Sequence, residues 1–154
     1  MAISMTDLLV FSDRTIDGFV RAVERLDDST INARPAALPQ ANTPFALVTH
    51  SFGAMDWWAG HIILGEPSDR DRDGEFTATG TCAQALDACA AARARLHAWA
   101  PRIDATATLA VAPQTQMPLA GEWTVGAALI HIYEELAQHL GHLEMTVDLL
   151  VTEA

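Results

Sequence analysis

Four side chains that can bind a metal ion or move a proton recur along one segment near the C-terminus. They are His131, Glu135, His139 and His142. On an α-helix, which turns by about 100° per residue, these positions share an arc of about 80° beside a stripe of leucine and valine. A carboxylate and imidazoles next to a core-facing stripe must be neutralised, hydrogen-bonded or bound to a cation, because burying them bare is costly. The segment therefore predicts a functional site rather than packing alone.

The strongest pair within this stripe is Glu135 and His139, which are four residues apart. This spacing brings their Cβ atoms to about 5–6 Å on one helical face, so both can bind one ion. A third ligand should come from a facing helix, and His50 is the best candidate because it lies among apolar residues. The alternative for His50 is a hydrogen-bonded core histidine. We prefer the metal site of His50, Glu135 and His139.

The remaining groups of the stripe are candidates for proton transfer. His131 lies one turn before Glu135, and His142 lies about one turn after His139, so one ion can hardly reach all of them. We therefore interpret both histidines as pocket-lining or catalytic groups, with partial exposure as the alternative. Tyr133 is a further candidate for assisting proton transfer.

Aromatic residues could form the wall of a pocket for a cofactor. Trp57 and Trp58 are the candidate cofactor-binding residues, and Trp123 could extend the same wall. Tryptophans at such positions also serve as core or interface material.

Four helices must position these side chains. Apolar periodicity and capping residues predict helices over about 4–26, 44–64, 82–100 and from 125 nearly to the C-terminus. Thr43-Pro44, a capping box from Thr81 to Gln84, and Thr124 indicate three of the helix starts. We expect a single all-α domain over 1–154, a four-helix bundle, with connections long enough for a non-standard helix order.

The connections carry weaker signals. Residues 101–123 favour an irregular loop, although alternation over 106–111 could form a short strand. Residues 69–74 are charged, and we expect them to be solvated. His61 is expected to be structural, and His97 to be a surface residue without a partner.

Composition excludes several classes of partner. The chain has 154 residues, 50% of them hydrophobic, with 20 acidic and nine basic residues and a net charge of −11. Such a surface repels phosphate backbones and acidic membranes, so we expect neither nucleic acid nor membrane as a partner. The apolar run at 57–64 is too short to span a bilayer, and no secretory signal is visible, so we expect a cytoplasmic protein.

The only two cysteines are Cys82 and Cys89. On one helix they lie about 10 Å apart, too far for a disulfide, which is typical of a reducing compartment. At a helix start, Cys82 could be acidified by the helix dipole, or it could simply be a small buried residue.

Three segments carry a resemblance to a known family: LVTHSFGAMDWWAGH, EFTATGTCAQAL and GEWTVGAALIHIYEELAQHLGH. Together they resemble the DinB-like superfamily, in the branch related to the N-terminal domain of mycothiol-dependent maleylpyruvate isomerase. The resemblance implies a bundle in up-down-down-up order with a divalent metal between the second and fourth helices. Its ligands fall on His50, Glu135 and His139, and glutamate at the second position is typical of the mycothiol branch.

The resemblance also implies an activity. We expect a metal-dependent transferase that activates a low-molecular-weight thiol such as mycothiol for transfer to a small electrophile. Zinc is the first choice of metal, and nickel, iron and manganese are compatible. The alternatives are a hydrolase that uses metal-bound water and a non-catalytic bundle that binds a small molecule. A homodimer is plausible, whereas maleylpyruvate isomerisation is not expected because the sequence ends at Ala154 without a second domain.

Overall fold

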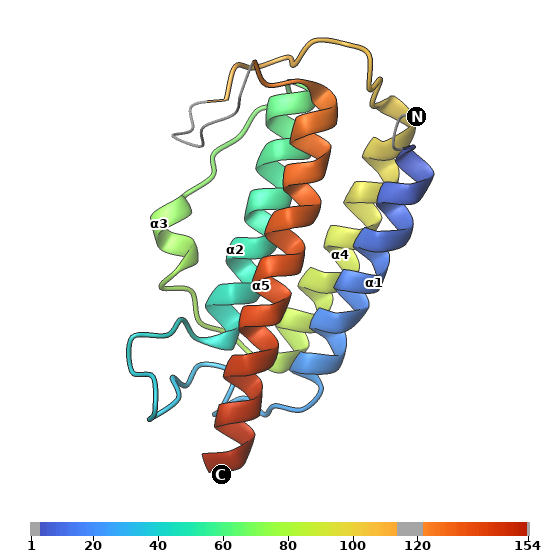
Figure 1. The fold of residues 1–154 in the computed structure, drawn as a ribbon. Helices are drawn as coiled ribbons and strands as arrows, with labels where there is room; N and C mark the ends of the chain where they lie inside the picture. The colour runs from blue at the N-terminus through green and yellow to red at the C-terminus, as the bar shows by residue number, and fades with distance from the viewer. Residues whose placement is uncertain (1–3, 114–121, 154) are drawn as a thin grey trace.

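The bundle is built from four long helices, α1 (Met5–Val23), α2 (Pro44–Asp56), α4 (Cys82–Trp99) and α5 (Val125–Glu153). The computed structural model describes residues 4–113 and 122–153, and within these residues it contains no strand. A one-turn helix, α3 (Arg72–Glu75), lies in the connection between α2 and α4 (Figure 1). The predicted all-α bundle is confirmed.

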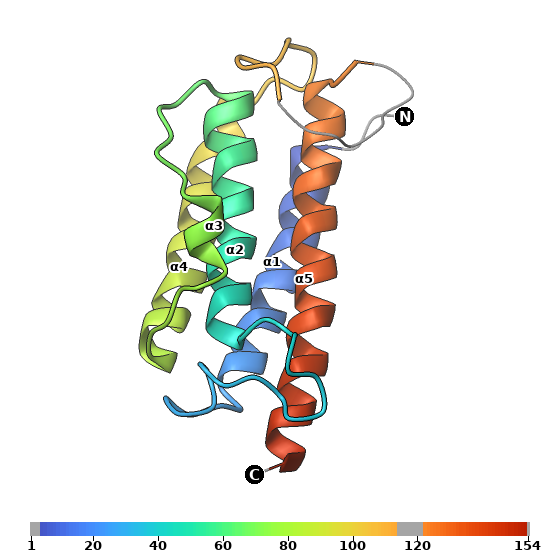
Figure 2. The same cartoon turned by 90° about the vertical axis from the view of Figure 1, so that its left-hand side faces the viewer.

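The helices follow the up-down-down-up order implied by the resemblance. In Figure 1, α1 and α5 run downward, and α2 and α4 run upward. Both α4 and α5 pack against α1 and against α2. Because α2 and α4 are parallel, the chain must return along the bundle between them. Residues 64–81, which we call the crossover, make this return beside α2 and carry α3 (Figure 2).

Side-chain caps begin three of the helices where the sequence predicts them. The Thr43 hydroxyl accepts a hydrogen bond from the amide of Ala46, and Pro44 occupies the first helical position. The capping box of α4 forms between Thr81 and Gln84, each side chain accepting from the other residue's amide. The Thr124 hydroxyl caps α5 by accepting a hydrogen bond from the Ala127 amide. These caps satisfy amides that have no partner inside the helix.

The second helix departs from the prediction at its C-terminal end. After Asp56 it widens into a π-helical segment, η1 (Trp57–Ile63), before it ends at Gly65. Gly65 has a φ of 73°, which a side chain would disfavour, so a glycine suits this turn. A π-helical turn changes the angular position of the residues that it contains. The faces of Trp57 and Trp58 therefore cannot be read from an α-helical period.

No strand forms over 106–111. After α4 the chain makes a short 3-10 turn, η2 (Ala100–Arg102), and then follows an irregular path up to residue 113. The Val111 amide donates to the Ile62 carbonyl, 3.1 Å away, which ties this loop to the end of η1. Up to residue 113 this is the irregular loop that the sequence favours; residues 114–121 of that prediction lie outside the described residues.

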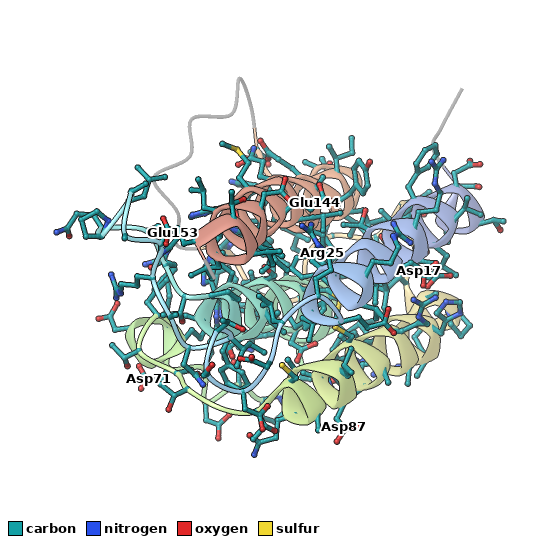
Figure 3. The ribbon with its side chains drawn as sticks, turned by 90° about the horizontal axis from the view of Figure 1, so that it is seen from below. Asp17, Arg25, Asp71, Asp87, Glu144 and Glu153 are labelled. Atoms are coloured by element: carbon teal, nitrogen blue, oxygen red, sulfur yellow. The ribbon has the colours of Figure 1, made fainter. Side chains whose placement is uncertain are left out.

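Apolar side chains from all four long helices fill the centre of the bundle, and charged side chains cover its outside. Seen from below, Asp17, Asp87 and Glu144 lie on the outer surface, and Arg25 lies between α1 and α5 (Figure 3). Within the described residues, no helix is both long enough and apolar enough to cross a bilayer. The largest fully buried core residues include Phe19, Leu47, Met55, Leu96, Ile132, Leu136 and Leu143.

Candidate metal centre

The stripe on α5 presents its polar atoms toward one another on successive turns. Glu135 Oε2 lies 3.2 Å from His139 Nε2, one turn further along the helix. Its other oxygen, Oε1, lies 3.4 Å from His131 Nε2, one turn earlier. Glu135 is therefore the centre of the stripe, with a different histidine at each carboxylate oxygen.

His50 completes the group from the facing helix, α2. Its Nε2 lies 4.0 Å from Glu135 Oε2, and its ring centroid lies 4.7 Å from that of His139, with the two rings perpendicular. His50 is only 4% exposed, whereas the side chains of Glu135 and His139 are 26% and 22% exposed. One ligand atom from each of the three residues lies within 4.8 Å of the other two. The structure thus brings together the three residues that the sequence nominates as metal ligands.

This donor set fits a divalent metal ion. Zinc binds imidazole nitrogen and carboxylate oxygen at about 2.0–2.2 Å, which places tetrahedral donor atoms about 3.4 Å apart. Glu135 Oε2 lies 3.2 Å from His139 Nε2 and 4.0 Å from His50 Nε2, and all three donors lie within 4.8 Å of one another, so side-chain movements that shorten the longer distances would let them share one ion. Two imidazoles and one carboxylate leave a coordination position for another group, as in catalytic rather than structural zinc sites.

The protonation states also suit a cation. Burial lowers the pKa of His50 below that of a free imidazole, despite the opposing hydrogen bond to Glu75. The hydrogen bond from His139 lowers the pKa of Glu135, against the effect of its partial burial. A neutral imidazole and an ionised carboxylate are the forms that coordinate metals, and neutral pH favours both here.

Behind His50 lies a pair of charged residues that the sequence analysis missed. His50 Nδ1 lies 2.8 Å from Glu75 Oε2, and Glu75 in turn accepts two hydrogen bonds from the Arg70 guanidinium. Arg70 lies within residues 69–74, which we expected to be solvated, yet its side chain is only 16% exposed, and the adjoining Glu75 is buried. Asp71, Arg72 and Asp73 are exposed, as predicted.

Behind Glu135 lies a second group of contacts, centred on His131. This histidine is 7% exposed, and its Nδ1 lies 3.0 Å from Glu134 Oε2. The rings of Trp58 and Trp123 pack against it at centroid distances of 4.8 and 5.6 Å. The two tryptophans also pack on each other, at 4.6 Å. His131 thus joins the α5 stripe to an aromatic wall beside the centre.

Trp57 packs edge to face against Trp58, at a centroid distance of 5.1 Å, and also reaches the crossover side. Its ring lies near His61 and under the Arg70 guanidinium, at 6.2 and 6.0 Å between centres. It lines a cleft of about 400 Å³ between η1, the crossover and α4. The cofactor-binding role of Trp57 and Trp58 stays a prediction: Trp58 contacts His131 on α5, and Trp57 also lines the cleft on the crossover side.

Tyr133 does not join the centre, which corrects the expectation that it assists proton transfer there. It is two residues from Glu135 and thus about 160° away around α5. Its ring packs edge to face against Phe11 of α1, at a centroid distance of 5.9 Å. With Phe11, Leu129 and Ile130 it lines an apolar hollow of about 600 Å³ at the α1–α5 groove. Its hydroxyl therefore belongs to another face of the bundle.

His142 stays a neighbour of the centre. It is partly buried, and its pKa is lowered by that burial and by the electrostatic effect of the neighbouring His139. His61 is structural as expected, with Nδ1 at 2.7 Å from the Glu66 carbonyl oxygen. His97 is exposed but has a partner that we did not foresee: its Nε2 lies 3.0 Å from Asp13 Oδ2.

The cysteines are both free, as the spacing predicts. The idea of an acidified Cys82 is wrong. The Asp28 carboxylate accepts a hydrogen bond from the Cys82 amide, so an anion already occupies this helix start. Burial and the Asp28 charge raise the pKa of Cys82, and burial raises the pKa of Cys89 to about 12. Neither thiol is predisposed to act as a nucleophile.

The fold and site define a class: helical bundles with a candidate metal centre of two histidines and one glutamate between two helices, here α2 and α5. The family described as mycothiol S-transferase matches residues 7–149, which is nearly the whole chain. The chain therefore belongs to the mycothiol S-transferase family, in agreement with the suspected DinB-like resemblance. Neither a search of curated proteins nor a search of solved structures found a match.

Proposed function

We propose that this protein is a divalent-metal-dependent mycothiol S-transferase that joins the thiol to a small electrophilic substrate. Membership of the family supports the thiol. The observation that carries the metal dependence is the convergence of His50, Glu135 and His139 within 4.8 Å across two helices. Zinc is the first choice of metal, and nickel, iron and manganese are compatible with the same ligands.

His50, Glu135 and His139 would hold the ion, and three protein ligands leave a coordination position for the thiol. A bound divalent cation supplies positive charge that stabilises a thiolate relative to a thiol, which raises the nucleophilicity of the sulfur at neutral pH. Glu135 and His139 are the more exposed ligands, so the thiol is expected to approach from their side. His50 is buried and serves as the fixed ligand on the inner side.

The transfer itself needs a proton acceptor and a place for the electrophile. The thiol proton passes to a neutral base, and His142, which is next to His139 on the stripe and favoured in its neutral form, is our candidate. The sulfur then forms a bond to the electrophilic carbon, while the leaving group departs with the electron pair of the broken bond. His131 supports Glu135 at this step rather than contacting the thiol.

The half-buried Trp123, which packs on the buried Trp58, is a candidate surface for the electrophile. The two rings are tilted by 31° to each other, and both adjoin His131 beside the centre. Flat, apolar rings bind planar or apolar molecules through their faces. We expect electrophiles with an aromatic group to bind better than small polar ones.

The proposal is tested with the purified protein, mycothiol and chlorodinitrobenzene, a general electrophile whose thioether product and released chloride are both measurable. We expect conjugation above the spontaneous rate with the zinc-loaded protein. The rate should fall to the spontaneous value after chelation and in the His139→Ala variant. Elemental analysis of the gently purified protein gives the native metal.

Two other results would overturn the proposal in different ways. Turnover of ester or amide substrates in thiol-free buffer, with no thioether formation, would identify a metal-dependent hydrolase instead. Absence of bound metal, together with unfolding that is unchanged by chelators, would indicate a bundle that binds small molecules without catalysis.

A further inference from the structure

The crossover sends two charged side chains into the bundle, where they meet the ring nitrogen of His50 that faces away from α5. Glu75 Oε2 lies 2.8 Å from His50 Nδ1. Arg70 Nε and Nη2 lie 2.6 and 2.8 Å from the two Glu75 oxygens. The three side chains thus form a continuous row from the solvent side of the crossover to the candidate metal centre.

Burial makes this arrangement costly unless each member has its partners. The Glu75 side chain is 8% exposed, and that of Arg70 is 16% exposed. Burying a carboxylate without a partner is unfavourable, but a two-point contact with a guanidinium offsets much of that desolvation. A surface ion pair would need no such burial. Because a buried ion pair adds little net stability, holding the crossover in place does not explain it, and its contact with His50 is the feature to explain.

The packing around Glu75 is shaped for it. A Cβ atom on Gly53 would lie 2.2 Å from Glu75 Oε1, so the glycine provides the space that the carboxylate occupies. On the next residue, the Phe76 ring lies over the His50 ring at a centroid distance of 4.3 Å. The crossover therefore restrains His50 by a hydrogen bond at its edge and by an aromatic contact on its face.

The chemistry of the pair determines which nitrogen of His50 carries the proton. The Glu75 oxygens accept hydrogen bonds from the Arg70 guanidinium, and the carboxylate offers His50 a further acceptor. A neutral His50 must therefore be protonated at Nδ1, which leaves the lone pair on Nε2, the nitrogen that lies 4.0 Å from Glu135. Carboxylates in this position orient metal-binding histidines and increase their basicity.

We propose that Glu75, held by Arg70, is a positioning residue of the metal centre: it fixes His50 in the Nδ1-protonated tautomer and directs Nε2 toward the ion. The proposal rests on the proposed function, because it concerns the same centre. It adds that the crossover, which supplies no ligand, contributes to the affinity for the metal. Arg70 contributes by holding the Glu75 carboxylate in place.

The test compares Glu75→Gln with Glu66→Gln, a matched control on the same crossover. Glu66 binds Trp99 Nε1 and Arg102 instead of His50. A glutamine at position 75 keeps the size of the side chain, but its amide can either donate to or accept from Nδ1. The double variant Arg70→Met/Glu75→Gln removes both buried charges together, and it keeps the test possible if the single variant folds poorly.

Two measurements are made on each folded variant. The first is the zinc dissociation constant, by competition with a chromophoric chelator. We expect it to rise about 10- to 100-fold for Glu75→Gln, the range typical of outer partners of metal ligands, and to change less than about twofold for Glu66→Gln. The second is the ¹⁵N chemical shifts of the His50 ring in metal-free protein. We expect an Nδ1-protonated ring in the wild type and in Glu66→Gln, and a mixture of tautomers in Glu75→Gln.

Wild-type affinity in Glu75→Gln, or the same His50 tautomer in both proteins, would overturn the proposal. Its failure is distinguishable from failure of the proposed function. If the wild type binds no zinc, the proposed function fails, and the ring shifts of metal-free protein still decide whether Glu75 sets the tautomer of His50. If zinc binds equally well to every variant, the positioning role fails and the proposed function stands.

Discussion

The two helices that meet at the candidate centre support their polar groups in opposite ways. On α5, each polar group is backed by a neighbour one turn away, as Glu135 is by His131 and His139. On α2, His50 has no such neighbour, and its support comes from Glu75, 25 residues further along the chain. The α5 side is partly exposed, whereas the α2 side is buried.

This difference separates two tasks. The α5 side offers accessible ligands to a reactant. The helix itself sets the distances between Glu135 and the histidines one turn away, so no other segment is needed to place them. The α2 side provides a fixed ligand, and it uses a long crossover, a glycine and an ion pair to hold one ring. We therefore expect substitutions on the α2 side to lower both the free energy of unfolding and the affinity for the metal. Substitutions on the α5 side should mainly change the metal affinity or the rate.

The largest effect is expected from removing a ligand on either side. His50→Ala and His139→Ala should both weaken zinc binding beyond the range of about 10- to 100-fold that is typical of outer partners. Their metal-free proteins should differ. His50→Ala removes the ring that is hydrogen-bonded to the buried Glu75 carboxylate, so it should lower the free energy of unfolding by about 1–3 kcal/mol. For the more exposed His139 we expect about 1 kcal/mol or less.

Urea unfolding in the presence of a chelator measures this difference, and chelator competition measures the affinities. Equal losses of stability in the two metal-free variants would contradict the division between a buried, supported side and an exposed side.

The same contrast explains what the sequence could and could not predict. Helical periodicity and capping residues are local, so the four helices, the caps at Thr43, Thr81 and Thr124, and the grouping on α5 all follow from spacing. The helix order came from the resemblance to a family. Glu75 and Arg70 were missed because no local pattern relates them to His50, and only a fold can show which segment returns beside α2.

One error could have been avoided from the sequence itself. Tyr133 is about 160° from Glu135 at α-helical spacing, so the helix that groups the ligands already excludes it from their face. The contact of Trp57 with Arg70 of the crossover could not be predicted in this way. It lies beside the π-helical turn η1, and an apolar run with one glycine gives no sign of such a turn.

A smaller effect is expected from the outer partner on the α5 side. His131→Gln removes the ring whose Nε2 lies 3.4 Å from Glu135 Oε1, and it should weaken zinc binding about 10-fold. His142→Gln is the matched change on the same stripe. It should leave zinc affinity unchanged but lower the turnover rate by about 100-fold or more, if His142 accepts the thiol proton. Parallel chelator competition and steady-state kinetics separate the two roles. An equal loss of zinc affinity in both variants would remove the distinction.

A pair of glycines sharpens the comparison of the two sides further. In Gly53→Ala, on α2, the new Cβ would collide with the Glu75 carboxylate, so we expect a loss of about 1–3 kcal/mol in stability and a modest loss of zinc affinity. Gly141, on α5, has no atom within 4 Å of the corresponding position. Gly141→Ala should therefore stabilise the protein by up to about 1 kcal/mol through helix propensity, with zinc affinity unchanged. Thermal unfolding with and without zinc measures both. A neutral Gly53→Ala would show that the space beside Glu75 is not needed.

The smallest effect is expected on α4, which carries both cysteines but no part of the centre. The proposed nucleophile is the thiol of a small molecule, and the chain's own thiols are held protonated, with the pKa of Cys89 raised to about 12 by burial. The double variant Cys82→Ala/Cys89→Ala should keep the transfer rate within about twofold and lose about 1 kcal/mol of stability from the truncation of the buried Cys89. Alkylation of the wild type at neutral pH should be slow and should leave the rate unchanged. A transfer rate that falls on alkylation, or in a folded double variant, would show that a cysteine of the protein takes part in the reaction. The small-molecule thiol would then not be the sole nucleophile.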